Sequence, residues 1–333
     1  MRHSSVMNFH ASPRMSFWLF GLLCLYGLSA AGLALSAVTE DETPPADATR
    51  QVGVLLERMA EALRSLNYEG ILVYLHENRL ETLSLLHHVE QGRVQERLIS
   101  LSGPVRAVAR ERDRVLCALP DGHPLSVERH GGGHILATDG IDPALLGDHY
   151  RAGILGTARI AGRDTDVVGI IPRDRLRYGY RFHIDRETAL PLKSDLIDKD
   201  QEPLEQLMFT SIVFNASDGV TPALVGQPVR NAPVTESTSR WRFNDPPKGF
   251  QLVMHHEIKQ PDGSAAEQFL FTDRLSAYSI YVEDGAQEGL DGLANIGAVH
   301  AVGRKIDGHR VTVIGEVPTA TVEAAIAGVR LAP

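Results

Sequence analysis

The chain has 333 residues and a formal net charge of −9, with 33 Lys and Arg against 42 Asp and Glu. Such an acidic balance excludes a general nucleic-acid-binding surface, which needs an excess of basic charge. The length predicts two domains of ordinary size, each able to bury its own hydrophobic core.

The first 37 residues read as a secretory signal. Arg2 and Arg14 precede an apolar run without charge over residues 17–38, and small residues lie just before the polar stretch that follows. This order predicts a signal peptide over residues 1–37, cleaved near Ser36 or Ala37. The alternative is an uncleaved anchor, because the run approaches the roughly 20 residues that span a bilayer. Small residues inside the run favour cleavage, which shifts the net charge from −9 to −11 by removing Arg2 and Arg14.

The predicted cleavage determines how many cysteines the mature chain retains. The sequence holds 2 Cys, and Cys24 lies within the signal. Cys117 is then the only thiol of the mature chain, so no internal disulfide can form. Its apolar neighbours predict a buried strand position.

The predicted N-terminal domain spans residues 38–215. An acidic, proline-bearing leader comes first, and then apolar residues recur at three- and four-residue steps over 49–66, which predicts an amphipathic helix. Short β-rich runs separated by tight turns follow, with a short helix expected at 142–146. Consecutive strands with such turns predict an antiparallel meander rather than a βαβ fold. Alternation of apolar and polar residues predicts that the strand at 178–184 has one apolar face and one polar face, and the strand at 208–214 repeats this pattern.

A change of composition predicts the domain boundary. Residues 216–236 are rich in Pro, Gly, Ser and Thr without periodicity, which is typical of a linker. Residues 237–333 then form the predicted C-terminal domain. Its strands are expected at 250–259, 267–272, 276–283, 292–305 and 310–317, with a closing helix at 319–329. The fold class is therefore α+β: a curved antiparallel sheet with helices, then a smaller antiparallel sheet covered by one helix.

No catalytic motif emerges from the sequence. It lacks a G-x-S-x-G elbow, a P-loop and an H-E-x-x-H pair. Histidines 87–88 and 255–256 are adjacent within predicted strands, so the two members of each pair point to opposite faces and cannot chelate one ion. We expect a protein that is not an enzyme and needs no metal or cofactor.

One strand invites a binding hypothesis. Residues 71–75 are apolar without alternation, so both faces of that strand need cover. The cover is either the domain's own far strands or an apolar ligand in the concave face of a curved sheet. A roughly 12-carbon acyl chain would gain about 9 kcal/mol from burial, before ordering costs. The candidate lipid-facing residues are Leu72, Tyr74, Tyr180 and Phe182.

Three segments resemble a known family. YRFHIDRETALPLKSD at 180–195, ALRSLNYEG at 62–70 and EQLMFT at 205–210 are similar to the corresponding segments of the MucB/RseB family. The first motif is shared in part with lipoprotein carriers of the LolA type. Position 189 is Ala where many relatives have Gly. The resemblance covers essentially the whole mature chain.

The resemblance implies a periplasmic regulator of the envelope-stress sigma factor. Such a protein binds the periplasmic part of a membrane anti-sigma factor of the RseA/MucA type and shields it from proteolysis. A LolA-like N-terminal domain senses lipopolysaccharide or lipoprotein acyl chains, the C-terminal domain contacts the anti-sigma factor, and the protein is a homodimer. Candidate partner-binding residues are the aromatics Phe269, Phe271, Tyr278 and Tyr281. The alternative is a lipid or lipoprotein carrier of the LolA type, which residues 237–333 disfavour.

Overall fold

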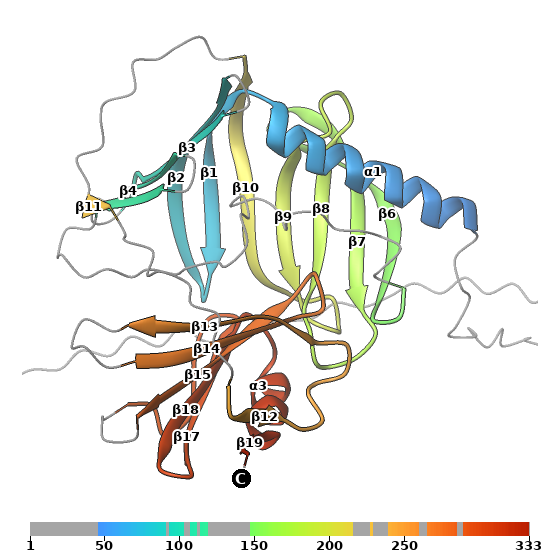
Figure 1. Ribbon diagram of the computed structural model, residues 1–333. Coiled ribbons are helices and arrows are strands. Elements are labelled where there is room, and N and C mark those ends of the chain that lie inside the picture. The colour runs from blue at the N-terminus through green and yellow to red at the C-terminus, as the bar shows by residue number, and fades with distance from the viewer. Residues whose placement is uncertain are drawn as a thin grey trace, which may run out of the picture. The chain divides into compact units, whose positions relative to one another are not determined.

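A computed structural model describes residues 46–90, 93–102, 107–111, 114–118, 147–215, 227–228, 239–259, 265–284 and 289–332. These residues form two large antiparallel sheets, a two-stranded sheet and two helices (Figure 1). The predicted α+β class is confirmed. Neither of the described helices is both long and apolar enough to cross a membrane.

The N-terminal sheet has eleven strands in the order β11-β5-β4-β3-β2-β1-β10-β9-β8-β7-β6, and the register of its neighbours is antiparallel throughout. The meander prediction is therefore correct. The strands are β1 (Tyr68–His76), β2 (Arg79–Glu90), β3 (Arg93–Ser100), β4 (Ala107–Glu111), β5 (Arg114–Ala118), β6 (Tyr150–Ile160), β7 (Arg163–Pro172), β8 (Gly179–Asp185), β9 (Pro191–Ile197), β10 (Pro203–Phe214) and β11 (Gln227–Pro228).

Helix α1 (Ala46–Ser65) lies across one face of this sheet (Figure 1). Its apolar stripe recurs at helical spacing and is buried at Val52, Leu56, Met59 and Leu63. That stripe packs in one core cluster with side chains of β1, β8, β9 and β10. The predicted helix at 49–66 is thus confirmed, and its burial fixes which face of the sheet is the inner one.

The alternation predicted for residues 208–214 is wrong. The pairing of β1 with β10 shifts between Ile71 and Leu72, so that Leu72 lies opposite Phe209. A β-bulge inserts one residue and reverses the side-chain phase on either side of it. Phe209, rather than Met208 or Thr210, therefore reaches the core, while Ile212 and Phe214 rejoin the inner face beyond the bulge.

The C-terminal sheet has six strands in the order β13-β14-β15-β18-β17-β16. Helix α3 (Thr319–Ala327) packs on its inner face through Val322 and Ile326. The strand predicted over 292–305 is wrong as a single element, because a turn at Gly297, with φ of 57°, divides it into a hairpin. The strands are β13 (Gln251–Lys259), β14 (Ala265–Thr272), β15 (Ala277–Asp284), β16 (Gly292–Ile296), β17 (Val299–Ile306) and β18 (His309–Gly315).

A separate two-stranded sheet was not predicted. Strand β12 (Trp241–Phe243) pairs with β19 (Val329–Leu331), so the start of the C-terminal region meets the end of the chain. The segment predicted as a linker also contributes Gln227 and Pro228, which pair with β5 of the N-terminal sheet. The predicted signal, leader and short helix at 142–146 lie outside the described residues, apart from the start of α1.

Candidate functional site: an aromatic groove in the C-terminal domain

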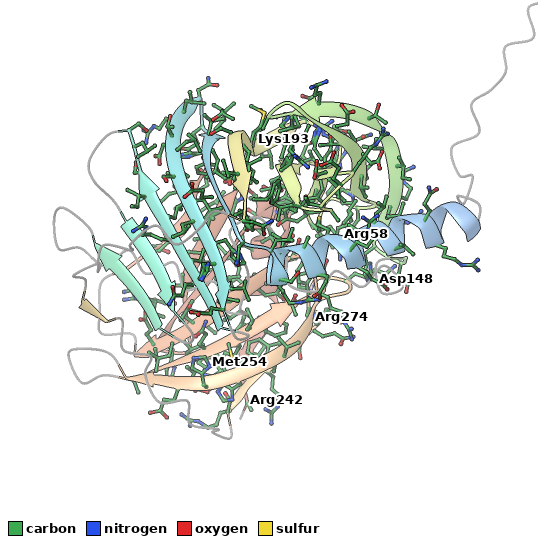
Figure 2. All side chains as sticks on the ribbon, turned by 90° about the horizontal axis from the view of Figure 1, so that it is seen from above. Arg58, Asp148, Lys193, Arg242, Met254 and Arg274 are labelled. Atoms are coloured by element: carbon green, nitrogen blue, oxygen red, sulfur yellow. The ribbon has the colours of Figure 1, made fainter. Side chains whose placement is uncertain are left out.

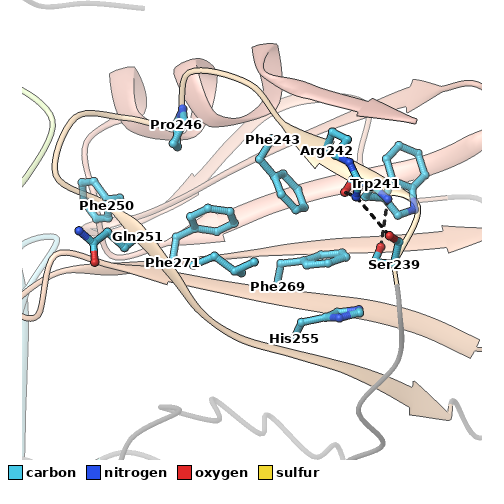
Figure 3. Close-up of a pocket in the computed structure, with 11 residues that line it drawn as sticks. Ser239, Trp241, Arg242, Phe243, Pro246, Phe250, Gln251, His255, Phe269 and Phe271 are labelled. Carbon is cyan, nitrogen blue, oxygen red and sulfur yellow. Dashed lines mark hydrogen bonds between the residues drawn. The ribbon is translucent and has the colours of Figure 1, made fainter. Parts of the chain in front are cut away.

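A groove of about 600 Å³ lies between β12, the loop after it, and the first two strands of the C-terminal sheet (Figure 3). Its walls are mostly aromatic. The lining residues are Ser239, Trp241, Arg242, Phe243, Pro246, Phe250, Gln251, Leu252, His255, Phe269 and Phe271.

Strand register and ring packing build the groove. His255 lies opposite Phe269 and Leu252 lies opposite Phe271 on the paired strands β13 and β14. Phe243 of β12 packs edge-on against both phenylalanines, with ring centroids 4.7 and 5.1 Å apart. His255 stacks on Phe269 at 4.3 Å, and its Nε2 lies 2.9 Å from a carboxylate oxygen of Glu267. Edge-to-face and stacked rings hold one another in fixed orientations, so the groove is preformed.

The rim of the groove adds exposed apolar surface. Strand β13 is the edge strand of its sheet, and Leu252 and Val253 within it are 46% and 57% exposed. A sheet edge beside an apolar pocket is the arrangement that accepts an extended peptide, since backbone groups and alternate side chains can both be bound.

The four predicted partner-binding aromatics divide between two faces. Phe269 and Phe271 line the groove, and Tyr278 stacks behind Phe271 at 5.1 Å, buried in the core. Tyr281 lies on the opposite face of the sheet, where its hydroxyl accepts a hydrogen bond of 2.9 Å from Gln268. Sequence reasoning missed Trp241, Phe243 and Leu252. The alternation of aromatics around Arg242 could have indicated a short strand there.

The four predicted lipid-facing residues lie together on the inner face of the N-terminal sheet. Leu72 and Phe182 are fully buried in the cluster beneath α1. Tyr180 stacks on Phe182 at 5.5 Å, and its hydroxyl lies 3.4 Å from a carboxylate oxygen of Glu316. Tyr74 donates a 2.6 Å hydrogen bond to Glu205.

A buried ion pair links the two large sheets, which belong to one compact unit from Pro44 to Pro333. Arg177, between β7 and β8, is fully buried and donates to Asp273, in the turn between β14 and β15. Tyr150 donates a 2.8 Å hydrogen bond to the same carboxylate. Burial and the adjacent Asp273 charge raise the pKa of Tyr150, so this hydroxyl keeps its proton and remains a donor.

Further contacts join the two large sheets in the same region. Leu275 of the C-terminal turn belongs to the N-terminal core cluster, and Thr321 of α3 donates to the carbonyl of Leu176. Burial, followed by the nearby charge of Glu316, raises the pKa of Tyr178 to about 12. Among the described residues no group of three or more His, Cys, Asp or Glu side chains is placed to hold a metal ion.

The chain matches two family models. The MucB/RseB N-terminal domain covers residues 51–236, and the MucB/RseB C-terminal domain covers residues 235–330. The sigma factor AlgU regulatory protein MucB of Pseudomonas aeruginosa is 32% identical over 86% of this chain and 93% of that protein. The sigma-E factor regulatory protein RseB of Escherichia coli K12 is 28% identical over 83% of this chain and 89% of that protein.

Solved structures agree with these matches. The crystal structure of MucB in complex with MucA(peri) has a TM-score of 0.68 at 29% identity, covering 85% of this chain and 99% of the solved one. A crystal structure of MucB has a TM-score of 0.61 at the same identity, covering 86% of this chain and 99% of the solved one. Two domain models in the family's order, matching most of the chain, show that this protein belongs to the MucB/RseB family of sigma-factor regulatory proteins.

Proposed function

We propose that this protein regulates an envelope-stress sigma factor by binding the periplasmic part of a membrane anti-sigma factor of the RseA/MucA type. The observation that carries the proposal is similarity over most of the chain to MucB, which has been solved in complex with MucA(peri). The aromatic groove supplies a preformed surface for a segment of that partner, with Phe269 and Phe271 at its base. Tyr278 supports the groove from behind, and Tyr281 serves an outer contact.

We further propose where the protein acts and how its binding affects the partner. The chain is exported by its first 37 residues, cleaved near Ser36 or Ala37, and acts in the periplasm as a homodimer. Binding shields the partner segment from the protease that would cleave it. The protein acts by binding rather than by catalysis and needs no cofactor. The N-terminal domain at 38–215 senses lipid, the linker at 216–236 connects the two domains, and the C-terminal domain at 237–333 binds the partner.

A lipid signal would act through the inner face of the N-terminal sheet. Leu72 and Phe182 are covered by α1, so an acyl chain can reach them only if the helix moves aside. Tyr74 and Tyr180 lie on the same face, and the acyl chain would contact them next. Lipopolysaccharide or a lipoprotein acyl chain then releases the partner only if it binds the partner-free form more tightly.

The proposed groove contact can be tested with one exposed leucine and a matched control. Leu252→Ser removes apolar rim surface, whereas Leu293→Ser changes a leucine of β16 that is 50% exposed and lies outside the groove. Burying half a leucine contributes about 1 kcal/mol, so Leu252→Ser should weaken binding of the anti-sigma periplasmic segment roughly fivefold. Isothermal titration would measure it. Equal weakening by Leu293→Ser would argue against the groove.

The alternative function is a lipid or lipoprotein carrier of the LolA type. The same titration distinguishes the two. A carrier would bind acylated peptide and leave the anti-sigma segment unbound, with or without residues 237–333. If the segment binds but lipopolysaccharide never releases it across a titration, the lipid switch is wrong while the regulator remains.

A further inference from the structure

Three arginines lie on the outer face of the small β12/β19 sheet. Arg242 lies directly opposite Arg330 in the strand register, and the amide of Ala332 donates a 2.8 Å hydrogen bond to the carbonyl of Arg240, which extends the ladder by one pair. Trp241 points inward into the core, so alternation places Arg240 and Arg242 on the opposite, outer side. All three arginines, named here the arginine face, are exposed, and Figure 2 shows Arg242 at the margin of the molecule.

The arginine face has no carboxylate of its own. None of its members forms an ion pair with any described residue, although the chain carries a net charge of −9. Like charges directly opposite each other on paired strands are destabilising. The guanidinium groups of Arg242 and Arg330 turn back along their own antiparallel strands and so toward opposite ends of the small sheet, which means that an extended anionic chain, rather than one small anion, would meet both of them.

Hydrogen bonds to the backbone fix the guanidinium groups in place. Arg242 Nη1 donates to the carbonyls of Ser239 and Trp241 at 3.3 and 3.2 Å (Figure 3). Arg330 Nη1 donates to the carbonyls of Ala327 and Val329 at 2.8 and 2.6 Å. In both residues Nε and Nη2 have no acceptor among the described residues, so each presents a pre-oriented fork to solvent. Such forks fit carboxylates in a bidentate manner.

We propose that the arginine face binds an extended acidic segment of the partner, with carboxylates at alternating positions. Residues two apart on a strand are separated by about 6.7 Å, so acids at i and i+2 of an extended chain match Arg240 and Arg242. Arg242 also lines the aromatic groove, so the two surfaces are continuous and the residues between the acids can be apolar. This inference rests on the proposed function and names the chemistry of the bound segment.

A defined peptide tests the charge pattern. The probe is a fluorescein-labelled decapeptide alternating Glu with Val and Phe, compared with the same peptide carrying Gln for every Glu. Fluorescence anisotropy at low salt should show binding of the acidic probe and much weaker binding of its Gln version. Each of R240Q, R242Q and R330Q should weaken binding about two- to fivefold, and the triple variant roughly 10- to 100-fold, as for exposed ion pairs. Binding should also fall as salt rises.

Controls separate the arginine face from charge in general. Arg304 of β17 is exposed and without an ion pair among the described residues, so R304Q should leave binding unchanged. R242K keeps the charge but loses the fork and should recover only part of the affinity. Equal binding of the Glu and Gln probes, or an equal effect of R304Q, would overturn the proposal. So would binding of phosphatidylglycerol vesicles through the arginine face without binding of the acidic probe.

The partner segment itself separates this inference from the proposed function. If the anti-sigma periplasmic segment binds, Leu252→Ser weakens it and the triple arginine variant does not, then the arginine face is wrong and the groove stands. If the segment does not bind the unaltered protein at all, the proposed function fails, whatever the acidic probe does.

Discussion

The ion pair between Arg177 and Asp273 gives the sharpest stability prediction. Both side chains are fully buried, and Asp273 also accepts the Tyr150 hydrogen bond. Replacing Asp273 with Asn keeps its shape but removes the fully buried counterion of Arg177. Breaking a buried pair in this way costs about 3–5 kcal/mol of unfolding free energy.

The expected loss lies near the lower end of that range. The reason is that Asp174 still pairs with Arg177 at 3.0 Å and compensates part of its charge. That compensation is incomplete because the Asp174 side chain is 31% exposed, so solvent partly screens its charge. We therefore predict that Asp273→Asn lowers the unfolding free energy by about 3 kcal/mol, against the 5–15 kcal/mol typical of a domain. Urea denaturation followed by circular dichroism measures it, and Glu187→Gln, at an exposed ion pair, should change it by less than about 0.5 kcal/mol.

A second substitution distinguishes a buried charge from lost packing. Arg177→Met in the Asp273→Asn background removes the stranded charge, so the double variant should regain part of the stability. A loss below about 1 kcal/mol in Asp273→Asn, or a double variant as unstable as the sum of the singles, would refute the reasoning.

Three further predictions concern packing and pH. A Cβ on Gly70 would lie 2.5 Å from a backbone oxygen of β10, so Gly70→Ala should cost about 1–3 kcal/mol in urea unfolding, whereas Gly153→Ala, with nothing within 4 Å, should be neutral. Leu63→Ala, buried on α1, should cost about 2–5 kcal/mol, and Val54→Ala, 50% exposed, should change thermal unfolding little. Burial lowers the pKa of His183 below its usual 6.5, so the unfolded chain binds the proton first. Stability should therefore fall as pH drops below about 6.5, and less steeply in His183→Gln, as chemical denaturation at several pH values would show.

Local sequence patterns were sufficient to predict most elements. Helical spacing of apolar residues in α1 and tight turns between β-rich runs depend on neighbours in sequence, so they predicted the first helix and the antiparallel meander correctly. The bulge in β10 was missed because it depends on pairing with β1, which is more than a hundred residues earlier. The turn at Gly297 was missed because continuous β-propensity around it conceals a hairpin.

The sequence by itself determined the acidic charge, the α+β class and the family of this protein. The aromatic residues at 269 and 271 suggested a binding surface in the C-terminal domain, because residue types are visible without a fold. Only the tertiary structure decided that Phe243 closes a groove over them and that Arg242 lies opposite Arg330. Both arrangements join residues about 25 to 90 positions apart, and no local pattern encodes which distant strands will pair.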